Sequence, residues 1–203
     1  MNAKRLVPLS GVVAVGCIVG AFAVGGETPD VDASLQDVVS FYTDHDSDQQ
    51  FAGLLLALGS LFFLFFSTNV AGLLRRAQGE TGGSSALSFG GGVMFSVGVA
   101  IFAGIAFTLG DAANDIEPAA LQALHVLGED MFFPLAVGAA AFLLGSGIAI
   151  VKTATLPKWL GWVAIVLGVV AATPAGFFAF MGLGIWTLIV SVMLSLRAGA
   201  EPA

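Results

Sequence analysis

Two histidines and a group of carboxylates are the side chains of this chain best suited to bind a metal ion. His45 lies between Asp44 and Asp46 in the segment TDHDSD, and His125 precedes Glu129 by four residues. On a helix, a spacing of four places His125 and Glu129 on one face. Imidazole nitrogens and carboxylate oxygens are common ligands of zinc and other divalent ions. These five residues are therefore the candidate metal ligands.

A second interpretation of the same residues needs no metal. The carboxylates are then solvated at the end of a membrane helix, and each histidine is hydrated or bonded locally. The single cysteine, Cys17, excludes an internal disulfide and a cysteine-based zinc site, and DHDSD lacks the glycine and the distal glutamate of a calcium loop. We expect this second interpretation, so we predict no catalytic residue and no resident cofactor. The divalent-metal site stays as the alternative.

The composition shows what must hold these side chains in place. Apolar residues make up 57% of the 203 residues and charged residues only 10%, whereas about a quarter of a globular domain is charged. A chain of this length cannot hide so much apolar surface from water inside its own core. The lipid bilayer is therefore the predicted solvent, and the predicted fold is an all-α, polytopic membrane helix bundle in one domain, residues 1–203.

Apolar runs of the length that a helix needs to cross about 30 Å of hydrocarbon recur along the chain. The first could be a cleaved signal sequence, because it ends in AFA at 21–23, but we expect it to be retained. The outer segments between spans are 25–50 and 110–130. The six predicted membrane spans are 7–24, 51–74, 86–109, 131–151, 159–172 and 177–196.

The last two spans come from a single apolar run that is too long for one crossing. The segment TPAG at 173–176 interrupts it, and proline and glycine are turn residues. We therefore predict a tight hairpin with a short fifth span. One long kinked helix is the alternative, because proline is tolerated in membrane helices.

Charge is distributed unevenly along the chain, whose formal net charge is −7. Seven acids lie between Glu27 and Asp48 and five between Asp111 and Asp130, whereas the basic residues flank the apolar runs. With six spans all Lys and Arg fall on one side, which predicts a plasma-membrane protein with both termini in the cytoplasm. A basic face for nucleic acid is missing from this pattern, so nucleic acid is not a predicted partner.

Both predicted outer segments contain helical patterns. Val31, Leu35, Val38 and Tyr42 follow the spacing of an amphipathic helix, which we expect on the membrane surface or on the top of the bundle. Ser47 and Gln50 resemble a capping box that opens the second span, and Pro118 resembles the start of another helix. Under the metal hypothesis, the first outer helix folds over spans three and four and brings His45 to His125 and Glu129.

Small residues recur at every fourth position in three of the spans, and such stripes allow membrane helices to approach closely. They predict that span three is the central helix of the bundle. The predicted partners are the lipid bilayer and, through these small-residue faces, a second copy of the chain or another protein. The stripes are Gly92, Ser96, Ala100, Gly104 and Thr108; Ala141, Gly145 and Ala149; and Ala164, Gly168 and Ala172.

Several longer pieces resemble a family of uncharacterised multi-pass membrane proteins common in actinobacteria. The pieces are VVSFYTDHDSDQQFAGLLLALGSLFFLFF at 38–66, LLRRA at 73–77, TATLPKWLGWVAIVLGVV at 153–170 and TPAGFFAFMGLGIWTLIVSVML at 173–194. The resemblance implies the same membrane topology. It implies no activity and no site residues.

Three classes of function are compatible with this pattern. The spans as drawn contain no Asp, Glu, Lys, Arg or His, and transporters that couple to protons usually carry an ionisable residue there. We therefore expect a non-enzymatic accessory, scaffold or binding protein of the membrane. A small channel or carrier for a neutral or lipophilic solute is the second hypothesis, and an outer-face metal-dependent membrane enzyme is the third.

Overall fold

The computed structural model describes residues 3–79 and 82–200, and within these ranges the regular secondary structure is entirely α-helical. This agrees with the predicted all-α bundle. The helices are α1 (Ala3–Gly25), α2 (Leu35–Asp44), α3 (Asp46–Gln78), α4 (Gly83–Asp111), α5 (Pro118–Asp130), α6 (Phe132–Thr153), α7 (Lys158–Ala171) and α8 (Gly176–Ala200).

Five helical segments of the described chain are long and apolar enough to cross a membrane. They are α1, α3, α4, the almost continuous pair α5 and α6, and α8. The sixth apolar helix, α7, has only 14 residues, which at 1.5 Å per residue span about 21 Å. It is therefore shorter than the hydrocarbon layer of about 30 Å. A bundle of apolar helices is clear, and α7 is the element on which the number of crossings depends.

The break between α7 and α8 is the hairpin that the proline and glycine predicted. α7 ends at Ala171 and α8 begins at Gly176. Thr173 closes the turn, because its hydroxyl donates to the carbonyl of Val170 and its own carbonyl accepts from the N–H of Gly176. α7 and α8 then pack against each other. The alternative of one long kinked helix is wrong.

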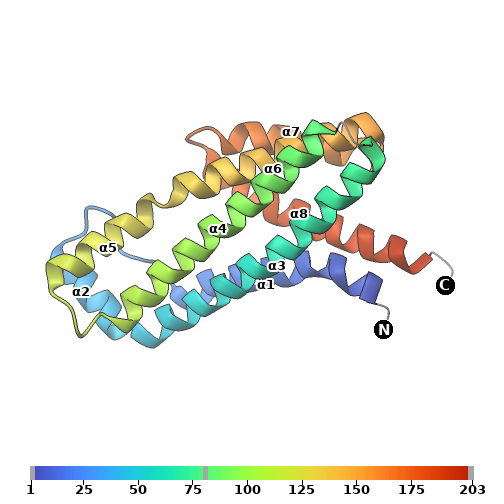
Figure 1. Cartoon of the computed structure of the whole chain (residues 1–203). Helices are drawn as coiled ribbons and strands as arrows, with labels where there is room; N and C mark the ends of the chain where they lie inside the picture. The colour runs from blue at the N-terminus through green and yellow to red at the C-terminus, as the bar shows by residue number, and fades with distance from the viewer. Residues whose placement is uncertain (1–2, 80–81, 201–203) are drawn as a thin grey trace.

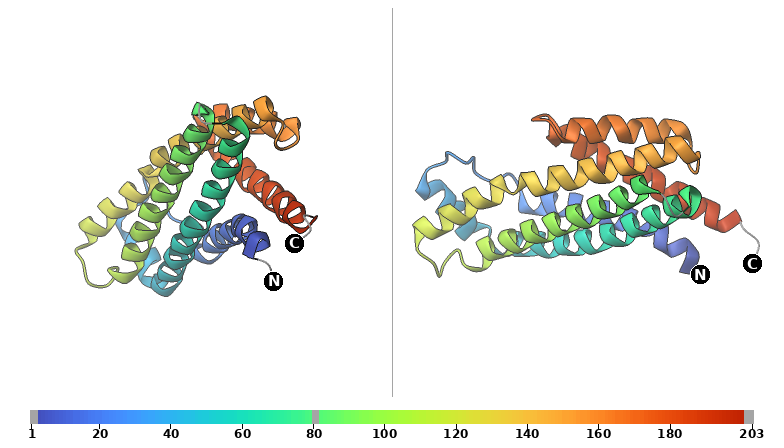
Figure 2. Two further views of the ribbon diagram at one scale, coloured as in Figure 1. Left: turned by 45° about the vertical axis from the view of Figure 1, so that its right-hand side comes forward. Right: turned by 45° about the horizontal axis from the view of Figure 1, so that its top comes forward.

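The six longer helices form a closed ring (Figures 1 and 2). In the order α1, α3, α4, α6, α7 and α8, each packs against the next, and α8 returns to α1. α3 and α6 also touch across the ring. α4 lies between α3 and α6 and packs extensively against both.

Aromatic rings fill the middle of this ring. Phe63 and Phe66 of α3 meet Phe142 of α6, with ring centroids 5.4 and 6.3 Å apart. Trp186 of α8 completes the cluster at 5.9 Å from Phe142, and its indole N–H donates to the carbonyl of Leu160 in α7 at 3.0 Å. These rings are almost completely buried. Edge-to-face contacts of this kind add to the stability gained by burial.

Glycines allow α4 and α6 to touch backbone to backbone. A methyl group at Gly91 would collide with the backbone of Phe142, one at Gly138 with Phe95, and one at Gly145 with Ser88. Only Gly145 belongs to the predicted stripes. The predicted stripe on α4 is buried at Gly92 and Ser96, but Ala100, Gly104 and Thr108 are exposed.

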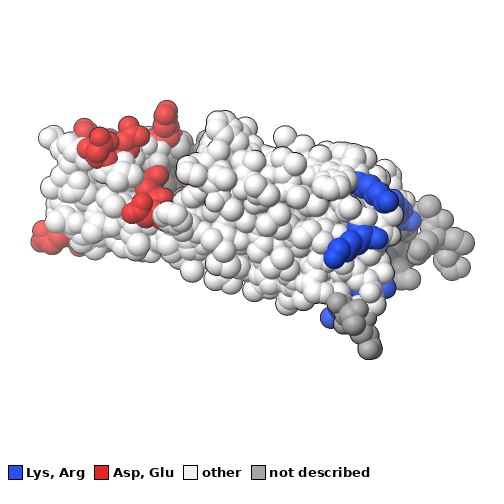
Figure 3. Space-filling model, turned by 90° about the horizontal axis from the view of Figure 1, so that it is seen from above, with Lys and Arg blue, Asp and Glu red and all other residues white. Residues whose placement is uncertain are grey.

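Charge divides the described part of the molecule into two ends, as Figure 3 shows. The described acids lie in α2, α5, the loops beside them and the adjoining ends of α3 and α4, which we call the acidic end. Arg75, Arg76, Lys152, Lys158 and Arg197 lie at the opposite end, which we call the basic end. Consecutive long helices run in opposite directions, so basic residues at the end of one helix and at the start of the next lie at the same end of the bundle.

The acidic end is closed by a cap formed by the loop 26–34, α2 and α5. Val38 and Tyr42 of α2 pack with Leu121 of α5 and Leu109 of α4 in a separate hydrophobic cluster. The amphipathic helix therefore lies on the top of the bundle, the second of its two predicted positions. It begins at Leu35 and not at Val31, because Ser34 caps it by accepting from the N–H of Asp37.

The junction between α2 and α3 differs from the predicted capping box. α3 begins at Asp46, and its N-cap residue, His45, makes no side-chain capping bond. The hydroxyl of Ser47 donates to the carboxylate of Asp46 at 2.9 Å. Ser47 is thus already inside the helix, and its side chain does not cap it.

Candidate functional site

The cap contains a buried hydrogen bond between Tyr42 of α2 and His125 of α5. The phenol oxygen lies 2.9 Å from Nδ1 of the imidazole, and the two side chains are 2% and 1% exposed. The amphipathic pattern of α2 turns Tyr42 towards the bundle, and α5 presents His125 on the face that also carries Leu121. This pair is the most buried polar contact of the cap.

Burial fixes the protonation state of the tyrosine. Removal from water raises the pKa of Tyr42 far above its ordinary value, and the negative charge of Glu129 raises it further. The phenol therefore keeps its proton. We assign it as the donor to Nδ1 of the imidazole, whose Nε2 then faces the carbonyl of Asp30, 3.5 Å away. This assignment gives each polar atom of the pair a partner.

Glu129 of α5 makes a further contact with the loop 26–34. Its carboxylate accepts a hydrogen bond from the hydroxyl of Thr28 at 3.2 Å, while Glu129 itself is exposed. Gln49 of α3, which is buried, donates to the carbonyl of Gly25 at 2.7 Å. The loop that follows α1 is thus tied to α3 and α5 by side chains that are far away in the sequence.

His45 takes no part in this arrangement. Its ring stacks on Phe41 at a centroid distance of 4.8 Å, and its Nδ1 lies 2.9 Å from the carbonyl of Phe41, one turn earlier. His45 and Asp44 are exposed, and Asp46 accepts hydrogen bonds from Ser47. The local bonding of His45 is what the interpretation without a metal expects.

The outer helix therefore folds over the bundle as the metal hypothesis required, but Tyr42 meets His125 there. The described residues contain no group of three or more His, Cys, Asp or Glu side chains that could hold a metal ion. A divalent-metal site at His45, His125, Glu129, Asp44 and Asp46 stays a prediction. What the geometry brings together is the hydrogen-bonded pair of Tyr42 and His125.

Sequence reasoning missed Tyr42 as a polar residue. It is the only tyrosine of the chain and stands on the apolar face of α2, where it was counted as a hydrophobic side chain. A tyrosine that is buried usually finds a partner for its hydroxyl, and His125 is one of only two histidines. Those two facts are the signal that could have identified the pair.

The chain was compared with protein-family models, with curated proteins and with solved structures, and none of them matches it.

Proposed function

We propose that this protein is a non-enzymatic accessory or scaffold protein of the plasma membrane, which acts by presenting its acidic cap to a partner outside the cell. The proposal includes cytoplasmic termini, because the described Lys and Arg side chains from α3 to α8 lie at the basic end and basic residues favour the cytoplasmic side. The actinobacterial family stays a prediction beside it.

The observation that carries the proposal is the ordered cap. A flexible connection between spans would need neither a hydrophobic cluster nor a buried hydrogen bond. This cap has Val38, Tyr42 and Leu121 buried against α4, and Tyr42 is bonded to His125. The two polar side chains bond to each other and are buried. They therefore stabilise the conformation of the cap and are not exposed to a substrate.

The filled centre of the ring favours this function over a channel or carrier. A solute path needs a polar or empty passage between the helices. The middle of the described bundle is occupied instead by the rings of Phe63, Phe66, Phe142 and Trp186, each no more than 2% exposed. The catalytic alternative would need the metal site, whose candidate ligands are not grouped.

Photocrosslinking in living cells tests the proposal. A photoreactive amino acid at Gln36 or Thr43, exposed on α2, should give one discrete protein adduct that mass spectrometry identifies. The same residue at Val166, which is 59% exposed on α7, should crosslink to lipid only. Equal adduct patterns at the three positions would contradict a partner of the cap.

A flux assay tests the alternative at the same time. Liposomes that contain the purified full-length protein should release glycerol no faster than protein-free liposomes. Release that rises with the amount of protein would contradict the scaffold proposal and favour the carrier.

A further inference from the structure

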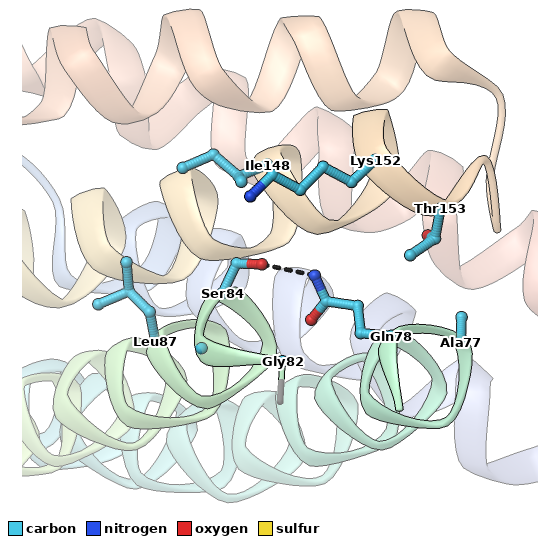
Figure 4. Close-up of a pocket in the computed structure, with 9 residues that line it drawn as sticks. Ala77, Gln78, Gly82, Ser84, Leu87, Ile148, Lys152 and Thr153 are labelled. Carbon is cyan, nitrogen blue, oxygen red and sulfur yellow. Dashed lines mark hydrogen bonds between the residues drawn. The ribbon is translucent and has the colours of Figure 1, made fainter. Parts of the chain in front are cut away.

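An open pocket of about 650 Å³ lies at the basic end, between the start of α4 and the end of α6 (Figure 4). Ser88 of α4 and Ser146 of α6 bond to each other at 2.8 Å where the two helices pack together. The pocket lies beside this contact. Its lining includes Gln78, Ser84, Leu87, Ile148, Lys152 and Thr153.

Lys152 is the one charged side chain among the described residues that line the pocket. Its side chain is exposed and extends from α6 along the opening, on the side of Ser84 (Figure 4). The described acids lie at the other end of the molecule. The ammonium group therefore faces the pocket without a carboxylate from the described lining.

The polar groups at the start of α4 complete the same wall. Gln78 donates to the hydroxyl of Ser84 at 2.6 Å and accepts from the N–H of Ser85 at 3.1 Å. The N–H groups of the first turn of α4 have no partner within the helix, and Gln78 already occupies that of Ser85. The N-cap residue, Gly82, provides no side-chain bond to the others. A lysine and a helix N-terminus on opposite walls of one pocket both favour a negative charge between them.

The apolar side chains of the lining favour a lipid anion over an anion dissolved in water. Leu87 is 45% exposed and, with Ile148, forms the wall on the bundle side of Lys152. Twenty residues of helix counted back from Lys152 reach Phe132, the first residue of α6, which is about the thickness of the hydrocarbon layer. Lys152 thus lies at the level of lipid headgroups, and Leu87 and Ile148 lie at the level of the acyl chains.

We propose that this pocket binds an anionic phospholipid. The ammonium of Lys152 and the N-terminus of α4 contact the phosphate, and Leu87 and Ile148 contact the first part of an acyl chain. This site does not depend on the scaffold function proposed above, because a channel or an enzyme could equally carry it.

Native mass spectrometry of the full-length protein tests the site with phosphatidylglycerol and phosphatidylcholine as probes. Lys152→Gln should lower the retained phosphatidylglycerol about 5-fold, the ratio that corresponds to one lysine near an anionic membrane. Phosphatidylcholine should change less. Lys158→Gln is the matched control, because Lys158 is exposed at the same end and does not line the pocket.

A second variant keeps the test independent of folding. Ser84→Asp places a carboxylate in the first turn of α4, which favours the helix but repels a phosphate. It should lower phosphatidylglycerol retention while the melting temperature of the protein is unchanged. Arg in place of Lys152 should retain the lipid.

Three results would overturn the proposal. Equal losses in Lys152→Gln and Lys158→Gln would mean general surface attraction, and an unchanged Ser84→Asp variant would remove the pocket. Displacement of the lipid by millimolar inorganic phosphate, with the same dependence on Lys152, would assign the pocket to a soluble anion.

Discussion

Replacement of Tyr42 by phenylalanine should loosen the cap while the membrane bundle stays intact. The ring that packs edge-to-face on Phe41 at 5.1 Å is retained, and only the hydroxyl is lost. Nδ1 of His125, in a side chain that is 1% exposed, then has no donor. A buried acceptor left without a partner costs about 1–3 kcal/mol.

This free energy corresponds to about a 5- to 150-fold rise in the opening equilibrium of the cap, at about 1.36 kcal/mol per factor of ten. Hydrogen exchange measured by mass spectrometry reports it directly. Amides of α2 and α5 should lose protection by that factor in Tyr42→Phe. Amides in the centre of α4 should be unchanged, because they belong to the larger hydrophobic core.

Two further variants separate the hydrogen bond from a general disturbance of α2. Ser40→Ala removes an exposed hydroxyl that donates to the carbonyl of Asp37 in the same helix, and it should change protection little. The double variant Tyr42→Phe with His125→Leu should lose less than the sum of the single variants, because two apolar partners leave no buried polar atom unpaired. A loss below about twofold in Tyr42→Phe, or strictly additive losses, would refute the role of this bond.

Three other outcomes follow from the packing and the burial. Tyr42, the only tyrosine, should show no tyrosinate absorbance near the ordinary tyrosine pKa of about 10 while the protein is folded. Because the pKa of Tyr42 is raised in the folded state, this group should leave the free energy of unfolding unchanged below about pH 10 and should lower it above that pH. Tyr42→Phe should remove this loss of stability at alkaline pH. Gly138→Val should prevent assembly of the bundle, because its Cβ would meet the backbone of α4, whereas Gly104→Val, with open space around it, should be tolerated; thermal melting in detergent distinguishes the two. Trp186→Phe removes the bond from the indole N–H to the carbonyl of Leu160, which keeps its partner within α7, and should lower the free energy of unfolding by about 0.5–1.5 kcal/mol, measured by denaturant titration.

The bundle could be predicted because its signals are local. Apolar runs of about 20 residues mark the long helices, the turn residues at 173–176 mark the hairpin, and the spacing of Val38 and Tyr42 marks the buried face of α2. Each of these depends on residues that are close in the chain. The structure follows them to within a few residues at the helix ends.

The partner of His125 could not be predicted in the same way, because it depends on how α2 lies across α5. Tyr42 is inside the last turn of α2, whereas His45 follows its end at Asp44. At that point the chain turns into α3, and His45 leaves the face that covers the bundle. Two residues three positions apart thus have opposite environments, and only the end of the helix decides between them.

The small residues of the predicted stripe on α4 do not all lie in a contact between helices, and the reason is geometric. A repeat of four residues advances about 40° around a helix of 3.6 residues per turn at each step. Gly92 and Ser96 therefore face α3, and Gly104, three steps after Gly92, has rotated by about 120° to the exposed side. The close contacts with α6 lie instead at Gly91 on α4 and at Gly138 and Gly145 on α6.

Labelling of single cysteines in intact cells tests most directly the central claim, which is that the acidic and basic ends lie on opposite sides of a membrane. In a variant that lacks Cys17, one cysteine is placed at Thr43 in the cap or at Gly79 at the end of α3. A membrane-impermeant maleimide should label Thr43→Cys in intact cells and Gly79→Cys only after the membrane is opened. Labelling of both positions from outside, or of neither, would contradict the account.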